Sequence, residues 1–139
     1  MKINYNFLPE ENLLFYHIQD EVSIEKWRSF YYFLMQKEEW NTIDKVLIDL
    51  RSSKNILSLI DCIQELVLFR KTVIKKKYNI VFLVDHPEVT VFAALYSKRL
   101  CGKKTCYYCS TVELALKYFK INIEMTKFNE TVKLLEQVF

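Results

Sequence analysis

Short apolar runs of strand length alternate along this chain with amphipathic stretches in which apolar residues recur every three or four positions. The strand-sized runs lie at residues 3–7, 13–18, 45–50, 78–84 and 105–109. The stretches of helical spacing lie at residues 24–35, 58–74, 88–100, 114–119 and 126–139. Such alternation predicts an α/β fold with right-handed crossovers: a mixed, largely parallel sheet of about five strands. The expected order is β-β-α-β-α-β-α-β-α with an extra C-terminal helix.

The residues between these segments mark turns and helix starts. Pro9–Asn12 separate the first two runs and predict a hairpin that feeds one edge of the sheet. Ser23 precedes the first helical stretch and fits an N-cap, and Pro87 suits the first turn of the third helix. Capping boxes of the S-x-x-D and S-x-x-E type begin at Ser58 and Ser110, so these serines are expected to cap the second and fourth helices.

Length and hydropathy indicate a single domain. The 139 residues are 51% apolar and 15% aromatic, enough to bury one sizeable core. No apolar run approaches the ~20 residues of a transmembrane helix. The N-terminal stretch also lacks the cleavage pattern of a signal peptide. We expect one domain over residues 1–139, with a core over about 1–120 and a helical extension over about 126–139, in the cytoplasm.

The charge and glycine content exclude several classes of ligand. Twenty basic and 17 acidic residues give a net charge of +3, too small to indicate nucleic acid, and we expect no nucleic-acid partner. Basic clusters at residues 75–77 and 98–104 fit solvated surfaces, the first also a helix end, with an anionic partner as the alternative. Gly102 is the only glycine, which excludes a Walker-type or dinucleotide-binding loop.

Three cysteines in "CGKKTCYYCS", residues 101–110, have the C-x4-C-x2-C spacing of iron–sulfur ferredoxins. Residues 105–109 also fit a strand, in which Cys106 and Cys109 would point to opposite faces. We therefore interpret the stretch as a buried strand whose cysteines act as small apolar residues, and expect no metal and no cofactor. A metal or cluster site and a redox role, such as a Cys101–Cys106 disulfide, are the alternatives.

Three stretches in this element order carry a family resemblance: "KVLIDLRSSK", "YNIVFLVDHPEVTVFAALYSKRL" and "YYCSTVELALKYF". They contain a D-L-R triplet at residues 49–51, an A-L-Y triplet at 94–96 and an E-L-A triplet at 113–115 followed by Phe119. Over residues 10–120 the chain resembles the STAS-like proteins. These are relatives of the anti-sigma-factor antagonists, and the chain is most similar to the group discussed alongside CRAL-TRIO lipid-transfer domains.

The resemblance implies a non-catalytic, regulatory module that binds a protein partner. Antagonists of the wider family carry a D-S-[ST]-G turn whose serine is phosphorylated by a partner kinase. Ser58 stands near that place, nine residues after Asp49, but Leu57 and Leu59 flank it and the glycine is missing. We interpret Ser58 as a helix cap, with phosphorylation as the alternative.

The expected site lies beyond the carboxyl ends of the strands, where open α/β sheets bind ligands. Helices starting near Ser58, Glu88 and Thr111 would turn their positive ends toward this edge and favour an anion. Arg51 would suit a phosphate or carboxylate. Three loops supply the other candidate residues: Asp49, Arg51, Ser52, Ser53, Asp85, His86, Ser110 and Thr111.

Two other functions fit the same sequence. A small hydrolase or transferase would use His86 as base, Asp85 or Asp49 to orient it, and Ser52 or Ser53 as nucleophile. No glycine elbow supports that interpretation. A small-molecule or lipid-binding domain would instead line an apolar pocket with aromatic residues. The candidates for that lining are Tyr31, Tyr32, Phe33 and Phe92.

The C-terminal stretch places apolar side chains at helical spacing from Phe128 to Phe139. A short isolated helix is marginal in water, so packing must stabilise it. We expect this helix to dock on its own sheet, with a homodimer contact as the alternative.

Overall fold

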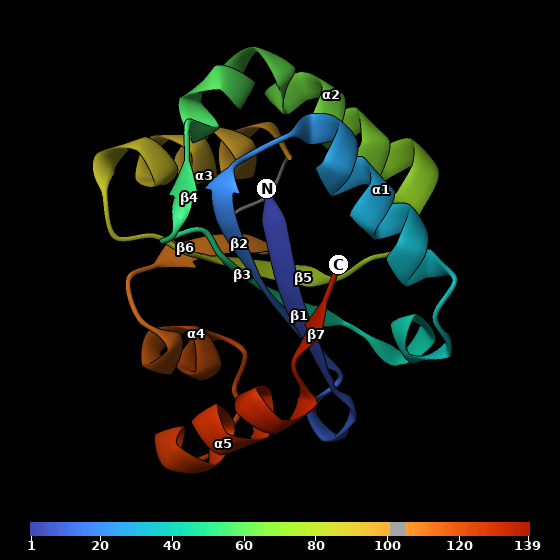
Figure 1. Ribbon diagram of the computed structural model, residues 1–139, viewed down its shortest axis with the longest axis vertical. Coiled ribbons are helices and arrows are strands. Elements are labelled where there is room, and N and C mark those ends of the chain that lie inside the picture. Colours follow the sequence, from blue (N-terminus) through green and yellow to red (C-terminus); the bar gives the residue numbers. More distant parts are fainter. Residues whose placement is uncertain (101–104) are drawn as a thin grey trace.

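Residues 1–100 and 105–139, which the computed structural model describes, build a sheet with helices on both faces (Figure 1). The strands are β1 (Lys2–Leu8), β2 (Leu13–Glu21), β3 (Lys45–Asp49), β4 (Ser53–Lys54), β5 (Asn79–Leu83), β6 (Cys106–Cys109) and β7 (Gln137–Val138). The helices are α1 (Ile24–Met35), α2 (Ile63–Phe69), α3 (Pro87–Arg99), α4 (Val112–Tyr118) and α5 (Met125–Leu135).

The strands follow the order β6-β5-β3-β2-β1-β7, and β4 pairs with β2. Pairs β2–β3, β3–β5 and β5–β6 are parallel, whereas β1 is antiparallel to β2 and β7. The predicted α/β class and mixed, largely parallel sheet are confirmed. The expected number of strands is wrong, because the described residues form seven. Strands β4 and β7 have only two residues each, too short to leave a period-two pattern.

Alternating side chains of the sheet form two cores. Helices α1, α2 and α3 cover one face, and α4 and α5 cover the other (Figure 1). Val46 and Ile48 of β3 belong to the first core, while Leu47 belongs to the second. This follows from the period of two along a strand. Within the described residues no helix is both long and apolar enough to cross a bilayer.

The predicted hairpin and first helix are confirmed. A 3₁₀ turn, Pro9–Glu11, joins β1 to β2, and Asn12 closes it in the left-handed region with φ 51°. The Ser23 hydroxyl accepts a hydrogen bond from the Lys26 amide at 3.3 Å and caps α1. This bond satisfies one of the amides that the first helical turn leaves unpaired.

The prediction of one regular helix over residues 58–74 with Ser58 as its cap is wrong. The segment begins earlier as a 3₁₀ helix, Ile56–Cys62, continues as α2 and ends in a π turn, Arg70–Ile74. Ser58 lies inside the 3₁₀ helix, whose N-cap position is Asn55, and its hydroxyl donates to the Asn55 carbonyl at 2.7 Å. The 3₁₀ and π turns place apolar residues at nearly the same spacing as an α-helix does. The sequence pattern therefore predicted a single α-helix.

The predicted cap of the fourth helix is displaced by one residue. Thr111 is the N-cap of α4, and its hydroxyl accepts a hydrogen bond from the Leu114 amide at 3.2 Å. Ser110 is exposed and precedes the cap. Serine and threonine are both good caps, so sequence spacing alone favoured the wrong one of two neighbours.

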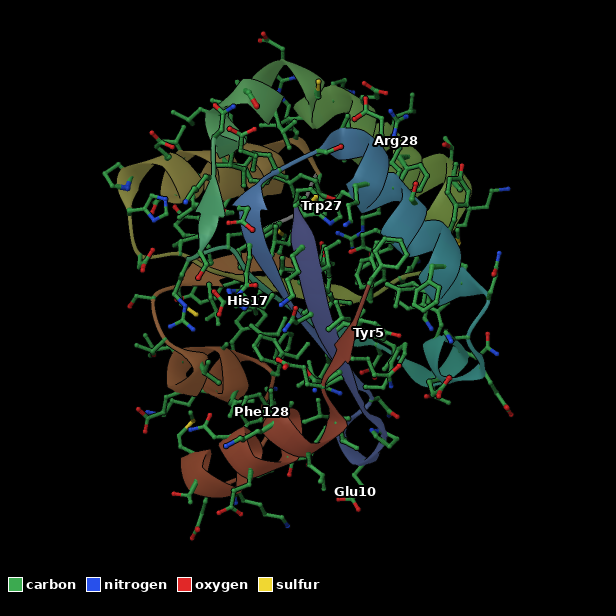
Figure 2. The ribbon with its side chains drawn as sticks, in the orientation of Figure 1. Tyr5, Glu10, His17, Trp27, Arg28 and Phe128 are labelled. Atoms are coloured by element: carbon green, nitrogen blue, oxygen red, sulfur yellow. The ribbon has the colours of Figure 1, made fainter. Side chains whose placement is uncertain are left out.

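The C-terminal segment docks on its own sheet, as predicted. Phe128 of α5, labelled in Figure 2, points toward the sheet. It is buried and packs against Phe15, with ring centroids 6.0 Å apart. The expectation of a helix as far as Phe139 is wrong, because α5 ends at Leu135 and β7 follows. The Phe139 amide donates to the Ile3 carbonyl at 2.8 Å. A homodimer contact would involve a second copy and stays a prediction.

Candidate functional site

Three parallel strands end side by side at the carboxyl edge of the sheet. Asp49 of β3 pairs with Leu83 of β5, and Leu83 pairs with Cys109 of β6. The amide of Leu50 donates to the Leu83 carbonyl at 3.1 Å, and that of Val84 donates to the Cys109 carbonyl at 2.9 Å. The loops that follow these strands therefore start next to one another.

Asp49 and Arg51 form a bidentate ion pair in the first loop. Asp49 is buried and accepts from the Arg51 Nε at 2.9 Å, from Nη2 at 2.8 Å and from the Arg51 amide at 3.1 Å. These hydrogen bonds, together with the negative charges of Asp49 and Asp85, raise the pKa of Arg51. The charge of Arg51 is thus largely compensated within the loop, which weakens its expected role as an anion ligand.

Asp85 and His86 form a second pair in the loop before α3. The His86 Nδ1 lies 2.7 Å from the Asp85 Oδ1, and the His86 carbonyl accepts from the Thr90 amide in the first turn of α3. His86 lines an open groove of about 680 Å³ between α3 and β6. Apolar side chains supply much of its lining: Val84, Pro87, Val91 and Tyr108.

The candidate hydroxyl groups are not brought together with His86, with one exception. Ser53 is buried, and its hydroxyl donates to the Leu50 carbonyl at 2.6 Å. Ser52 is exposed, and its carbonyl accepts from the Asp20 amide at 3.2 Å. Neither residue lines the groove that holds His86, whereas Ser110 does. Thr111 is occupied as the cap of α4.

The strand interpretation of the cysteines is confirmed where the structure describes them. Cys106 belongs to the core under α1, α2 and α3, and Cys109 to the core on the opposite face. Burial raises the pKa of both thiols, so they stay protonated at neutral pH. In residues 1–100 and 105–139, no three His, Cys, Asp or Glu side chains are grouped to hold a metal ion. Cys101 lies outside these residues, so the Cys101–Cys106 disulfide stays a prediction.

Two tyrosines of β6 are exposed, which corrects the prediction that the whole strand is buried. Tyr107 is 41% exposed and Tyr108 is 38% exposed. Tyr107 stacks on Tyr118 of α4 with ring centroids 4.8 Å apart. Sequence reasoning treated these aromatics as core residues and missed this surface. The signal was the element order, because the last strand of such a series can lie at the sheet edge.

The aromatic side chains expected to line a lipid pocket do not share one. Tyr31 lines an interior cavity of about 20 Å³, which is room for roughly one water molecule. Tyr32 is exposed, whereas Phe33 contacts Phe139 and Phe92 packs near Trp27. Tyr31 and Phe92 therefore belong to the core, Phe33 packs against it, and Tyr32 lies on the surface.

No protein-family model, no curated protein and no solved structure matches this chain. The resemblance to STAS-like proteins therefore rests on the three quoted stretches and on the element order, and it stays a proposal.

Proposed function

We propose that this chain is a non-catalytic, STAS-like regulatory module that binds a protein partner along β6 and the adjoining groove. The carrying observation is the pair of exposed tyrosines, Tyr107 and Tyr108, on this strand. Strand β6 is the terminal strand of the sheet order and pairs with β5 alone among the described strands. Aromatic side chains on a half-paired strand are typical of protein-binding surfaces.

The partner would add an extended segment to the open edge of β6. Unpaired backbone groups of an edge strand supply hydrogen bonds for such a segment, and side-chain pockets supply selectivity. Tyr108, Val91 and Pro87 give the groove apolar contact area. Asp85 and His86 at its end form a polar rim of the kind that surrounds protein interfaces. Asp49, Arg51 and Ser52 would contribute only at the margin, since they do not line the groove.

Partner capture with matched variants tests this proposal. The tagged chain would be used as bait in an extract of its source cell, and a captured protein would be purified and its affinity measured. We expect Tyr108→Glu to abolish binding, because it places a charge in the apolar centre of the contact. Tyr32→Glu is the matched control, since Tyr32 is 50% exposed on α1 and lies away from the groove. Equal affinity of both variants would contradict the proposed surface.

A hydrolase or transferase is the second candidate, and the 2.7 Å contact between His86 and Asp85 favours it. This contact would orient the imidazole as a general base in the groove. The Thr90 and Ser110 hydroxyls both line the groove, and that of Thr90 donates to the His86 carbonyl, so Ser110 is the better candidate nucleophile. A broad substrate screen would decide. Turnover that is lost in both His86→Ala and Ser110→Ala would replace the binding proposal with the catalytic one.

A further inference from the structure

A basic pocket lies at the opposite end of the sheet, where β3 and β5 begin. Its volume is about 670 Å³, a size typical of small-molecule sites. Asp44 in its lining is paired with Lys45 at 2.7 Å. It is the one carboxylate among the described residues of this lining. The basic residues are Lys45, Arg70, Lys71, Lys75, Lys76 and Lys77.

Arg70 is the buried member of this group, with only 8% of its surface exposed. Its Nη2 donates to the Tyr78 carbonyl at 2.6 Å, and the guanidinium lies 4.3 Å from the centre of the Tyr78 ring. Its Nη1 is buried without a hydrogen-bond partner in the described part of the chain. A buried cation without a counter-charge is unfavourable, so an anion that reaches the guanidinium would stabilise it.

The backbone of this region departs from a regular helix. The Lys75 amide donates to the Arg70 carbonyl at 3.0 Å and closes a π turn, a feature common at functional sites. Lys75 itself adopts a left-handed conformation with φ 56°. Glycine or asparagine is favoured at such a position, so the chain keeps a cation there against its conformational preference.

The dipole of the preceding helix explains only part of the cluster. Cations near a helix C-terminus are favoured, which accounts for Lys75 and its neighbours. The helix dipole does not account for Lys45, which begins β3, or for the burial of Arg70. Partial burial also lowers the pKa of Lys76, whose ammonium donates to the Trp40 carbonyl. The cluster therefore holds several cations close together in partly buried positions. Repulsion between like charges opposes this arrangement.

We propose that this pocket binds a small molecule that carries two or more phosphate groups. Each phosphate carries about −1.5 to −2 charges at neutral pH, so two groups offset about three to four positive charges in the pocket, whereas a carboxylate offsets one. The lysines act as mobile point charges around the phosphates. The Arg70 guanidinium, held by the Tyr78 carbonyl, supplies a fixed donor in the lining of the pocket. This site lies away from the proposed partner surface and does not depend on it.

Calorimetric titration of the full chain with inorganic tripolyphosphate at low ionic strength tests the proposal. We expect binding that weakens as salt is raised, because exposed charges are screened. The double variant Lys75→Glu/Lys77→Glu should bind at least roughly tenfold more weakly, since both residues are exposed in the pocket. The matched control is Lys54→Glu/Lys133→Glu, which changes the net charge equally at exposed positions outside the pocket. This control should bind within roughly threefold of the original chain.

Amide chemical shifts locate the site independently of affinity. Tripolyphosphate should move the signals of Asn79 and Thr105, which line the pocket, and leave those of the groove at His86 unchanged. No binding at millimolar tripolyphosphate, or equal weakening in both double variants, would overturn the proposal. Tighter binding of citrate would overturn the assignment to phosphate, and tighter binding of a single-stranded oligonucleotide would overturn the assignment to a small molecule.

Discussion

The buried carboxylate of Asp49 limits the binding role of Arg51 by pairing with its guanidinium. It follows the apolar run of β3 and is held inside the carboxyl edge of the sheet. Both of its oxygens accept from Arg51, so the guanidinium folds back onto its own loop. The D-L-R triplet at residues 49–51 therefore has a structural role in this chain. The sequence could not reveal it, because contact between residues i and i+2 depends on the conformation of the turn.

Replacing Asp49 by asparagine should destabilise the fold. The amide cannot accept the three hydrogen bonds of Arg51 as a charged carboxylate does, and Arg51 is left without its counter-charge. Because the Arg51 side chain is partly exposed, we expect a loss of about 1–2 kcal/mol in the free energy of unfolding. Urea unfolding measures it. The control Glu65→Gln removes the partly exposed ion pair with Arg28 and should change stability by less than about 0.5 kcal/mol. Equal losses would contradict this account of Asp49.

Buried tyrosines should make the fold sensitive to alkali. Burial raises the pKa of Tyr16, Tyr31 and Tyr78, and raises that of Tyr96 from 10.0 to about 12. Between pH 10 and 12 the unfolded chain therefore loses the Tyr96 proton while the folded chain keeps it, so stability falls as pH rises through this window. For Tyr96 alone we expect the free energy of unfolding to be about 1.4 kcal/mol lower at pH 11 than at pH 9.

Denaturant unfolding at both pH values measures this effect, and Tyr96→Phe isolates the contribution of one residue. The variant should lose less stability between pH 9 and pH 11 than the original chain, by about 1.4 kcal/mol. The same pH dependence in both chains would show that Tyr96 ionises equally in the folded and unfolded states.

At the scale of elements, two adjacent hydroxyl residues at the start of α4 differ in their expected contribution to stability. Thr111→Ala removes the acceptor of the Leu114 amide and should lower the free energy of unfolding by about 1 kcal/mol. Ser110→Ala changes an exposed residue outside the helix and should stay within about 0.5 kcal/mol. Thermal or urea unfolding of the two variants gives the comparison. A larger loss of stability for Ser110→Ala than for Thr111→Ala would show that Ser110 caps α4, as the sequence predicted.

Long segments with a clear period were predictable, and short or irregular ones were not. Strands β3 and β5 and helices α1 and α3 each bury a regular apolar set, so their pattern determined their type. Residues 56–74 also bury apolar side chains regularly, yet they change from 3₁₀ to α to π geometry. These geometries differ in which backbone carbonyl each amide bonds to. The amino-acid composition does not determine that choice. Strand β7 depends on an interaction with β1, more than a hundred residues away in sequence.

At the scale of the whole molecule, parallel pairing made the meeting of the candidate loops predictable, but not the arrangement of their side chains. It brought the loops after β3, β5 and β6 to one edge, as the order of elements implied. Which hydroxyl is buried, as in Ser53, and which lies in the groove, as in Ser110, depends on loop conformation. The basic pocket was visible in sequence only as a lysine run, because Arg70 and Lys45 join it through the tertiary fold.

The C-terminal segment completes the sheet, and its removal should lower the stability of the whole fold. Deleting residues 125–139 takes away α5 and β7, exposes Phe15 and leaves the outer edge of β1 unpaired. Burial of Phe128 alone is worth about 3–5 kcal/mol by the usual effect of Phe→Ala substitutions, so the melting temperature should fall by about 10 °C or more. The exposed apolar face and free edge should also make the shortened chain associate.

Thermal unfolding and sedimentation velocity at two concentrations would measure both effects on the same samples. The control is Leu134→Ala, because Leu134 is 84% exposed on the same helix and its loss should leave melting temperature and mass unchanged. Phe128→Ala should reproduce much of the loss of stability without removing β7. A full chain that sediments as a dimer and becomes a stable monomer on deletion would place α5 between two copies. Unchanged melting temperature and unchanged mass would show that the segment does not stabilise this sheet at all.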